Sequence, residues 1–422
     1  MTTDIATCPI DHVNPFDPDL LADPYPYYAR LREEAPVYVH PQLGIVFVST
    51  DELIREAAKQ PKVFSNDFAS MLRGGGSAKV EPEIAEIMAS AHPPIDTLLT
   101  ADPPVHSRYR KLGQKAFSYK RVLGMDDYIR GISNELIDGF IDNGKCEFRT
   151  SFADLLPMYV IVDMLGADRE DLDLFFDWSH AFVAQMSGVL DLDGKIDAAK
   201  KVVAFQDYFT QKIHEKRESP TEDIISDLVH ADLSEEGDPR KMTDAELISY
   251  LQQFLVAGNE STANSLAAAL YYLIKSPEQM AELRADHSLI PNFVEESLRM
   301  LSPSNNMWRL ATQDTELGGV PIKAGQMVLL RYGSGNRDAC RYADPDSFDI
   351  HRENAREHLA FGHGIHTCIG AQLARREMIV AFEQLLSRLD NIQLSPDQAD
   401  VTYSPNILLR GPTELNITFD KA

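Results

Sequence analysis

A glycine-rich segment near the end of the chain places one cysteine where its thiol could bind a metal. The segment reads Phe361-Gly-His-Gly-Ile-His-Thr-Cys368-Ile-Gly370. Its glycines let the backbone turn tightly and lie against a large flat ligand, which a Cβ would obstruct. The residues from Ile369 to Ile379 have the composition of a helix, so Cys368 is expected at a helix N-terminus. There the free amides and the helix dipole would stabilise a thiolate.

A second group of reactive side chains lies inside a predicted helix from Asp244 to Lys275. Between two apolar runs, the middle of this helix reads Ala257-Gly258-Asn259-Glu260-Ser261-Thr262. These polar residues form helices less readily than alanine, and hydroxyls can bond back to the preceding turn, so we expect a local opening of the helix. A diatomic ligand or water could then sit beside Ala257 and Gly258, where Glu260 and Ser261 could pass protons to it. Alternatively, Glu260 and Ser261 are satisfied buried groups that fix helix packing.

Helix signals dominate the elements that must position these residues. Three segments fit capping boxes, beginning at Ser49, Thr243 and Ser276. Strand-like pieces are short, and comprise Val37 to His40, Gly44 to Val48, Val320 to Ile322, Gln326 to Leu330 and Glu414 to Phe419. The predicted fold class is therefore mainly α with small β-sheets (α+β).

No repeat, low-complexity tract or flexible linker divides the 422 residues. We therefore predict one domain over residues 1–422. Region 66–100 contains Gly74-Gly75-Gly76 and His92-Pro93-Pro94 and is expected to be a mobile substrate-access loop. Its alternative is a surface insertion with no role.

The composition of the chain indicates where the protein is expected to work and which classes of partner are unfavourable. The chain is 44% apolar, without a run of 18 apolar residues or a visible secretory signal, so we expect a soluble cytoplasmic protein. Four cysteines without a CxxC pair make a disulfide framework improbable. The net charge of −25 argues against nucleic acid and anionic membranes as partners. Six basic residues could form local basic patches, and the alternative is that they are scattered solvated charges. They are Arg108, Arg110, Lys111, Lys115, Arg375 and Arg376.

The cysteine segment, Phe361-x-x-Gly364-x-His366-x-Cys368-x-Gly370, resembles the haem-binding signature of the cytochrome P450 family of haem-thiolate monooxygenases. Three further features lie in the order of that family: the segment 257–262, Glu296-Ser-Leu-Arg299 on a predicted helix, and the segment 344–352 that ends at Arg352. The resemblance runs from about Pro15 to the C-terminus. It implies the cytochrome P450 fold, with a long central helix over haem b and a cysteine-ligand loop.

The resemblance also implies roles around the haem. Cys368 is the axial thiolate, whose electron donation favours cleavage of the O–O bond of dioxygen. Phe361 and Gly362 lie near the sulfur, while Ala257 and Gly258 face the haem from the central helix. The structural triad that supports the cysteine loop is Glu296, Arg299 and Arg352. The partners of the haem propionates are His106, Arg110, Arg309 and His366.

Glu260 and Ser261 correspond to the acid and alcohol pair that delivers protons during oxygen activation in this family. The usual alcohol is threonine, whereas this chain has serine at position 261. Serine keeps the hydroxyl but lacks the methyl group that stiffens χ1. We therefore expect a functional but less tightly held proton relay.

The function implied is insertion of one oxygen atom from O2 into a small hydrophobic substrate. The chain carries no flavin or iron–sulfur region, so electrons are expected from a separate iron–sulfur ferredoxin with its reductase. The positions expected to contact substrate are Gln253, Val256, Ala257, Ser304, Asn305, Asn306, Ile407 and Leu408. Their neutral polar groups place terpenoid- or steroid-like substrates ahead of fatty acids and aromatic acids.

Three other functions explain fewer of these sequence features. A peroxide-driven hydroxylase would not need the acid and alcohol pair. A gas-sensing or gas-carrying haem protein would leave the proton relay and the variable loop unexplained. A structural zinc site built from His363, His366 and Cys368 would have only three clustered ligands and no use for the glycine spacing.

Overall fold

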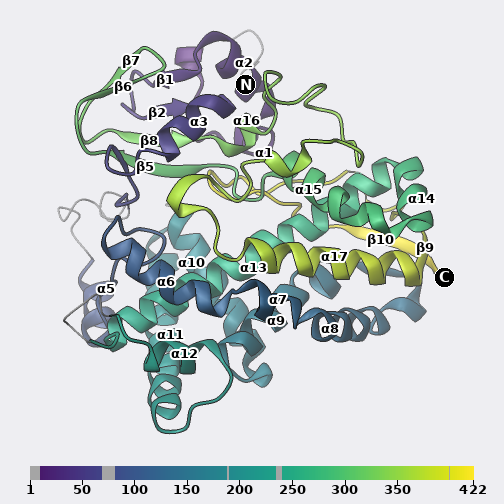
Figure 1. Cartoon of the computed structure of the whole chain (residues 1–422), viewed down its shortest axis with the longest axis horizontal. Helices are drawn as coiled ribbons and strands as arrows, with labels where there is room; N and C mark the ends of the chain where they lie inside the picture. Colours follow the sequence, from purple (N-terminus) through teal and green to yellow (C-terminus); the bar gives the residue numbers. More distant parts are fainter. Residues whose placement is uncertain (1–9, 69–80, 188–189, 234–239, 399) are drawn as a thin grey trace. The chain divides into compact units, whose positions relative to one another are not determined.

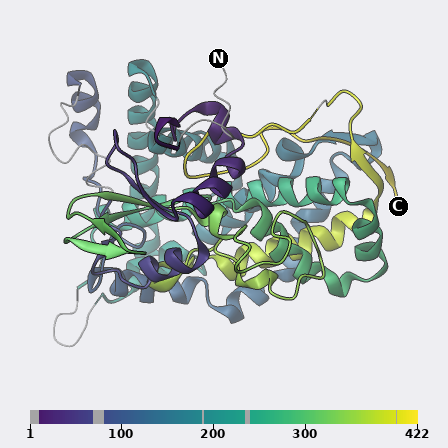
Figure 2. The same cartoon turned by 90° about the horizontal axis from the view of Figure 1, so that it is seen from above.

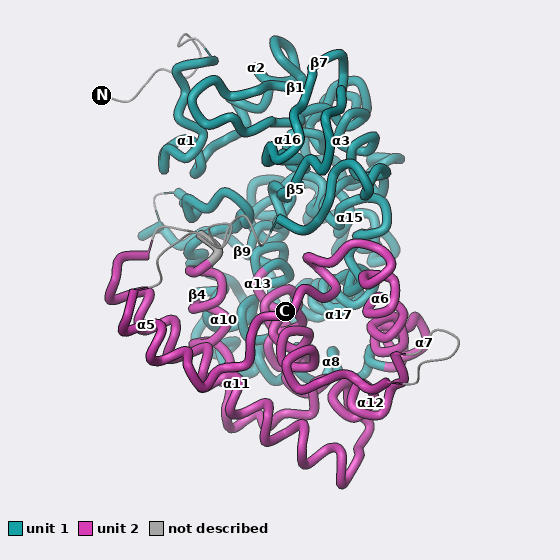
Figure 3. Tube along the Cα trace, turned by 90° about the vertical axis from the view of Figure 1, so that its left-hand side faces the viewer, with its two compact units in different colours: residues 1–68, 125–156, 261–422 teal, residues 69–124, 157–260 magenta. Residues whose placement is uncertain are grey.

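The structure is a computed structural model that describes residues 10–68, 81–187, 190–233, 240–398 and 400–422 (Figure 1). It contains two compact units (Figure 3). Unit 1 comprises residues 1–68, 125–156 and 261–422, and unit 2 comprises residues 69–124 and 157–260. The long helix α13 (Asp244–Lys275) contributes residues to both. The assignment of residues 1–422 to one domain stays a prediction.

A five-stranded sheet in unit 1 joins segments from opposite ends of the chain. Its order is β1 (Val37–Val39), β2 (Val46–Val48), β8 (Met327–Leu330), β5 (Met307–Ala311) and β3 (Phe64–Ser65). β2 and β8 are parallel, with Val46 opposite Val328, and the other pairs are antiparallel. Figure 2 shows these purple and green strands side by side.

Successive side chains of β2 enter two different cores, as expected for the period of a strand. Val46 and Val48 pack in one buried cluster with Leu330, whereas Phe47 packs in another with Tyr28. The sheet is therefore buried on both faces at this strand.

The remaining elements of unit 1 are helices and two small sheets. The helices are α1 (Pro18–Ala22), α2 (Tyr25–Glu34), α3 (Asp51–Ala58), α8 (Asp126–Asp138), α14 (Pro277–Ala285), α15 (Ile290–Leu301), α16 (Tyr332–Gly335) and α17 (Ala371–Arg388). One sheet has the order β4 (Lys145–Glu147), β10 (Asn416–Lys421), β9 (Leu389–Leu394), and the other pairs β6 (Thr315–Leu317) with β7 (Val320–Ile322). α17 packs along α8 (Figure 1), where Arg376 forms an ion pair with Asp126.

Unit 2 is helical. Its elements are α5 (Pro82–Ile87), α6 (Val105–Ala116), α7 (Tyr119–Leu123), most of α9 (Leu155–Leu165), α10 (Leu172–Ser187), α11 (Leu192–Glu218), α12 (Ile224–His230) and the first half of α13. α10 packs on α11 through aromatic rings, with the centroids of Trp178 and Phe205 5.6 Å apart. Within the described ranges, no helix is both long and apolar enough to cross a membrane.

The prediction of a mainly α fold with small sheets is confirmed, and each predicted strand has a counterpart in the structure. Only one of the three predicted capping boxes forms. The Glu246 amide donates to the Thr243 hydroxyl, and the Thr243 amide donates to the Glu246 carboxylate. Thr50 and Ser276 make no capping bond through their side chains. At α3 the Asp51 amide donates to the distant Asp338 carboxylate instead, at 3.0 Å.

The expected opening of the central helix was wrong, because α13 runs unbroken from Asp244 to Lys275. One back-bond of the expected kind does form: the Ser265 hydroxyl donates to the carbonyl of Ser261 at 2.7 Å. Gly258 serves close packing instead, since a Cβ there would lie 3.2 Å from the Ile161 side chain.

Region 66–100 is more regular than the sequence suggested, although its residues 69–80 lie outside the described part of the chain. It contains α5, and three side chains hold its later residues within unit 2. The His92 amide donates to Gln206, the Ile95 amide to the Ser249 hydroxyl and the Leu99 amide to Gln253, at 2.7, 2.9 and 2.9 Å.

Candidate active site

Cys368 lies in a tight turn of unit 1, three residues before α17 begins. Its side chain is exposed, and its amide donates to the carbonyl of Phe361 at 2.8 Å. The helix starts at Ala371 with Gly370 as N-cap, slightly later than the sequence predicted. The backbone that carries the thiol is thus internally bonded.

Two glycines explain how the loop reaches this shape. Gly362 and Gly364 have φ values of +69° and +78°, a region that glycine occupies without the steric cost of a Cβ. A Cβ on Gly364 would also lie 2.4 Å from the carbonyl oxygen of Ala58 in α3. The loop is therefore fixed against α3 by close backbone contact.

Unit 1 also contains a buried cluster of one carboxylate and two guanidinium groups. The carboxylate of Glu296 in α15 bonds to Arg299 at 2.7 and 2.8 Å and to Arg352 at 3.0 and 3.1 Å. The side chains of Glu296 and Arg299 are fully buried and that of Arg352 is 8% exposed. The remaining guanidinium donors bond to backbone carbonyls of Asn336, Ala343, Asp344, Pro345 and Ser347. The cluster therefore ties the 343–352 segment to α15.

The four residues assigned to the haem propionates are divided between the units. Arg309, on β5, and His366, in the cysteine loop, lie in unit 1, and Arg309 is 3% exposed. His106 and Arg110 lie one turn apart on α6 of unit 2. Burial lowers the pKa of His106, and Arg110 adds to this effect. Within unit 1, the thiol of Cys368, the guanidinium of Arg309 and the ring of His366 are groups that suit an iron porphyrin with carboxylates.

The residues of the expected proton relay lie on consecutive positions of α13. Ala257, Gly258 and Glu260 belong to unit 2, whereas Ser261 begins the part of the helix in unit 1. Helical geometry separates Glu260 and Ser261 by about 100° around the axis. Their side chains therefore leave the helix in different directions, and their role in proton delivery stays a prediction.

Sequence reasoning missed one buried acid beside this segment. Glu377, on α17, is 2% exposed, and its carboxyl shares a hydrogen bond with the Thr262 side chain. Burial raises the pKa of Glu377 to about 8, and the Thr262 bond offsets this only in part. The local sequence around Glu377 gave no signal, because the burial of this side chain depends on the packing of α17 against α13.

Replacing Glu377 with glutamine is expected to flatten the pH dependence of stability. The folded carboxyl keeps its proton to about pH 8, whereas the unfolded one loses it near the ordinary pKa of 4.5. The folded state therefore binds more protons between these values, so this contribution is complete below pH 4.5 and is lost as pH rises toward 8. Between pH 5 and 8 the unfolding free energy of Glu377→Gln should gain roughly 3–4 kcal/mol relative to the parent protein.

Urea unfolding at both pH values measures this difference. Glu383→Gln, on the same helix but in a partly exposed pair with Arg130, is the control and should show little change. Parallel pH curves for Glu377→Gln and the parent would contradict the assignment of a neutral buried carboxyl.

Two of the segments expected to contact substrate meet in unit 1. Ser304 bridges to Leu409, and the Asn305 amide donates to the carbonyl of Leu408 at 2.7 Å. The side chains of Asn305 and Asn306 are buried and bond to the Tyr28 hydroxyl, and Asn306 also donates to the carbonyl of Ile407. These bonds give both asparagines a structural role at the start of β5.

The third such segment lies in unit 2 and includes Gln253 and Val256. The Gln253 amide accepts from the Leu99 backbone and donates to the Thr97 hydroxyl at 2.7 Å. Both ends of this side chain thus hold the segment after Pro94. Contact between Gln253 and substrate stays a prediction.

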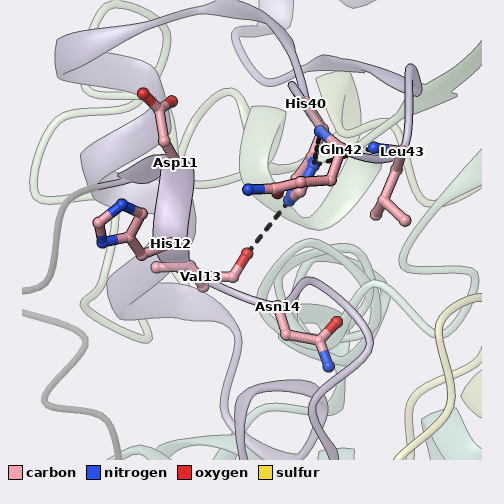
Figure 4. Close-up of a pocket in the computed structure, with 7 residues that line it drawn as sticks. All are labelled: Asp11, His12, Val13, Asn14, His40, Gln42 and Leu43. Carbon is pink, nitrogen blue, oxygen red and sulfur yellow. Dashed lines mark hydrogen bonds between the residues drawn. The ribbon is translucent and has the colours of Figure 1, made fainter.

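The cavity shown in Figure 4 is separate from all of these residues. It has a volume of about 210 Å³ and is lined by Asp11, His12, Val13, Asn14, His40, Gln42 and Leu43. Across the described residues, no group of three or more His, Cys, Asp or Glu side chains is placed to hold a metal ion. His363 was one of the three residues considered for a zinc site. Its Nδ1 atom lies 3.2 Å from a guanidinium nitrogen of Arg55.

Comparison with known proteins agrees with this fold and cysteine loop. The sequence model of the family "Cytochrome P450" matches residues 158–419. A steroid C26-monooxygenase from Mycobacterium tuberculosis is 32% identical over 392 residues, covering 93% of this chain and 92% of the relative. Nocardicin C N-oxygenase from Nocardia uniformis is 35% identical, covering 96% and 98%. The solved structure of cytochrome P450 CYP109Q5 from Chondromyces apiculatus matches with a TM-score of 0.85 and 35% identity, covering 98% of this chain and all of that one.

The mainly α fold and the cysteine loop are typical of haem monooxygenases. The chain belongs to the cytochrome P450 family. It is a cytochrome P450 monooxygenase, and its cofactor is haem b.

Proposed function

We propose that this enzyme hydroxylates a neutral terpenoid- or steroid-like molecule in the cytoplasm, with Cys368 as the axial ligand of the haem iron. The observation that carries the ligand assignment is the geometry of the Cys368 loop, whose backbone is bonded at Phe361 and turns through positive φ at Gly362 and Gly364. When bound, the haem supplies oxygen activation. Arg309 and His366, in the same unit as Cys368, would bind its carboxylates, and the same role is proposed for His106 and Arg110.

The names of the relatives support a steroid-like class of substrate and no particular molecule. One relative is named a steroid C26-monooxygenase, whereas another is named for nocardicin C. The expected contact segments carry amides and apolar side chains and no arginine to bind a carboxylate. Fatty acids and aromatic acids, or a peroxide-driven reaction, are the alternatives.

A titration of the purified holoenzyme with a substrate panel tests this class. Neutral steroids and terpenoids should shift the Soret band at lower concentration than fatty acids or aromatic acids of similar size. Tighter binding of the acids would overturn the substrate proposal, and product formation with peroxide alone at full rate would favour the alternative reaction.

Ser261 is proposed to donate a proton through its hydroxyl, with Glu260 resupplying it. Ser261→Ala should therefore release several-fold more hydrogen peroxide per NAD(P)H consumed, while substrate binding stays unchanged. Ser261→Thr, which restores the branched side chain, should be coupled at least as well as the parent. Equal peroxide release from all three proteins would remove this hydroxyl from proton delivery.

Electrons are proposed to come from an iron–sulfur ferredoxin that docks on basic side chains. Lys111 and Lys115 are exposed one turn apart on α6. Arg375 and Arg376 already bind Glu295 and Asp126, so we assign the two lysines the larger share of docking. Lys111→Glu with Lys115→Glu should raise the KM for an acidic ferredoxin several-fold at low salt and less at high salt. An unchanged KM at low salt would contradict this docking site.

A further inference from the structure

One carboxylate beside the cysteine loop binds two side chains that the haem assignments do not use. Glu295 lies next to Glu296 on α15. It accepts from Arg375 of α17 at 2.7 and 3.0 Å and from His358 at 3.0 Å. The side chains of Glu295, His358 and Arg375 are 9%, 1% and 14% exposed. Arg356 approaches the same carboxylate from solvent, at 3.7 Å.

Backbone bonding fixes the charge of the histidine in this cluster. The Nδ1 atom of His358 accepts from the amide of Ala360 at 3.1 Å, so its proton lies on Nε2 and is donated to Glu295. Burial also lowers the pKa of His358, which favours this neutral ring. Burial acts to raise the pKa of Glu295, but its bonds to His358 and Arg375 outweigh that effect and keep it below its usual value. Glu295 and Arg375 therefore form a compensated pair of charges beside a neutral ring.

The two groups held by Glu295 both contact Phe361. The guanidinium carbon of Arg375 lies 4.4 Å from the centre of the Phe361 ring, and the His358 ring lies 5.5 Å from it. The carbonyl of Phe361 accepts the amide of Cys368. A continuous series of contacts thus connects the Glu295 carboxylate to the backbone of Cys368, all within unit 1.

We propose that Glu295 is a positioning residue for the Cys368 thiolate and that its balance with Arg375 sets the reduction potential of the haem iron. The inference rests on the proposed ligation of the iron by Cys368. Groups around a metal ligand tune the metal through orientation and local charge. A surplus positive charge in this partly buried place stabilises the reduced iron, and a surplus negative charge stabilises the oxidised iron.

Opposite charge changes at the two partners test the proposal on the holoenzyme. Glu295→Gln keeps the side-chain shape, leaves Arg375 uncompensated and should shift the reduction potential to a more positive value. Arg375→Gln should shift it to a more negative value, and the double variant should lie between the two. Asp126→Asn, which removes the carboxylate partner of the neighbouring Arg376, is the matched control and should shift the potential less than Glu295→Gln.

Thermal unfolding and the spectrum of the reduced carbon monoxide complex accompany each potential. A purely structural cluster would lower the melting temperature and leave the potential unchanged, which would overturn the inference. Shifts of the same sign in both single variants would overturn it as well. If Glu295→Gln does not fold, the sign of the shift in Arg375→Gln decides. Absence of a thiolate spectrum in the parent protein would instead refute the proposed ligation.

Discussion

Glu296→Ala is expected to lose roughly 3–5 kcal/mol of unfolding free energy, because removing one partner leaves buried charges uncompensated. The carboxylate binds two guanidinium groups, those of Arg299 and Arg352, and also accepts the amide of Asp349. Neither arginine can turn to solvent without breaking its bonds to backbone carbonyls. Urea unfolding followed by circular dichroism measures the loss, and we expect poor haem retention in the same preparations.

Glu282→Ala gives the matched control on α14. Glu282 pairs with His351, and their side chains are 49% and 53% exposed. An exposed pair of this kind contributes about 0–1 kcal/mol. A loss for Glu296→Ala no larger than that of Glu282→Ala would contradict a supporting role for the buried cluster.

Cys368→Ser is expected to abolish monooxygenase activity while leaving the protein folded. The hydroxyl of serine is a much weaker electron donor than a thiolate, so we expect a fall of more than about 100-fold, beyond the loss typical for changes around a metal ligand. The bond from residue 368 to Phe361 uses only backbone atoms, so the substitution leaves it in place. Activity with a substrate found in the binding panel and far-UV circular dichroism measure the two effects.

Cys340→Ser controls for the general loss of a thiol. Cys340 is also exposed, and its amide bonds to Asp338 through backbone that the substitution leaves in place. This variant should keep full activity. Comparable activity in Cys368→Ser would contradict the assignment of the axial ligand.

Local patterns were sufficient to predict several elements. The apolar residues on both sides of segment 257–262 gave α13 with its observed ends, because long periodic segments are the most reliable signal. The short, continuous apolar runs of β2 and β8 predicted both strands. The cysteine loop was predicted because its glycines are needed for positive φ values at Gly362 and Gly364.

Features that depend on distant packing were not predicted. β3 has two residues and exists through pairing with β5, as in the pair Phe64 and Ala311. The bonds of Gln253 to Thr97 and Leu99 join residues about 155 positions apart, and no local pattern marks them. The bond between Glu377 and Thr262 likewise joins two helices that are distant in sequence. The bond between Glu295 and Arg375 forms only when α15 and α17 pack together.

The carbon monoxide spectrum of the reduced holoprotein tests the central claim most directly, because a thiolate ligand shifts the Soret band strongly to the red. We expect this band in the parent protein and in Cys340→Ser, and its loss in Cys368→Ser. Its absence from the folded, haem-loaded parent, or its persistence in Cys368→Ser, would contradict ligation of the haem by Cys368.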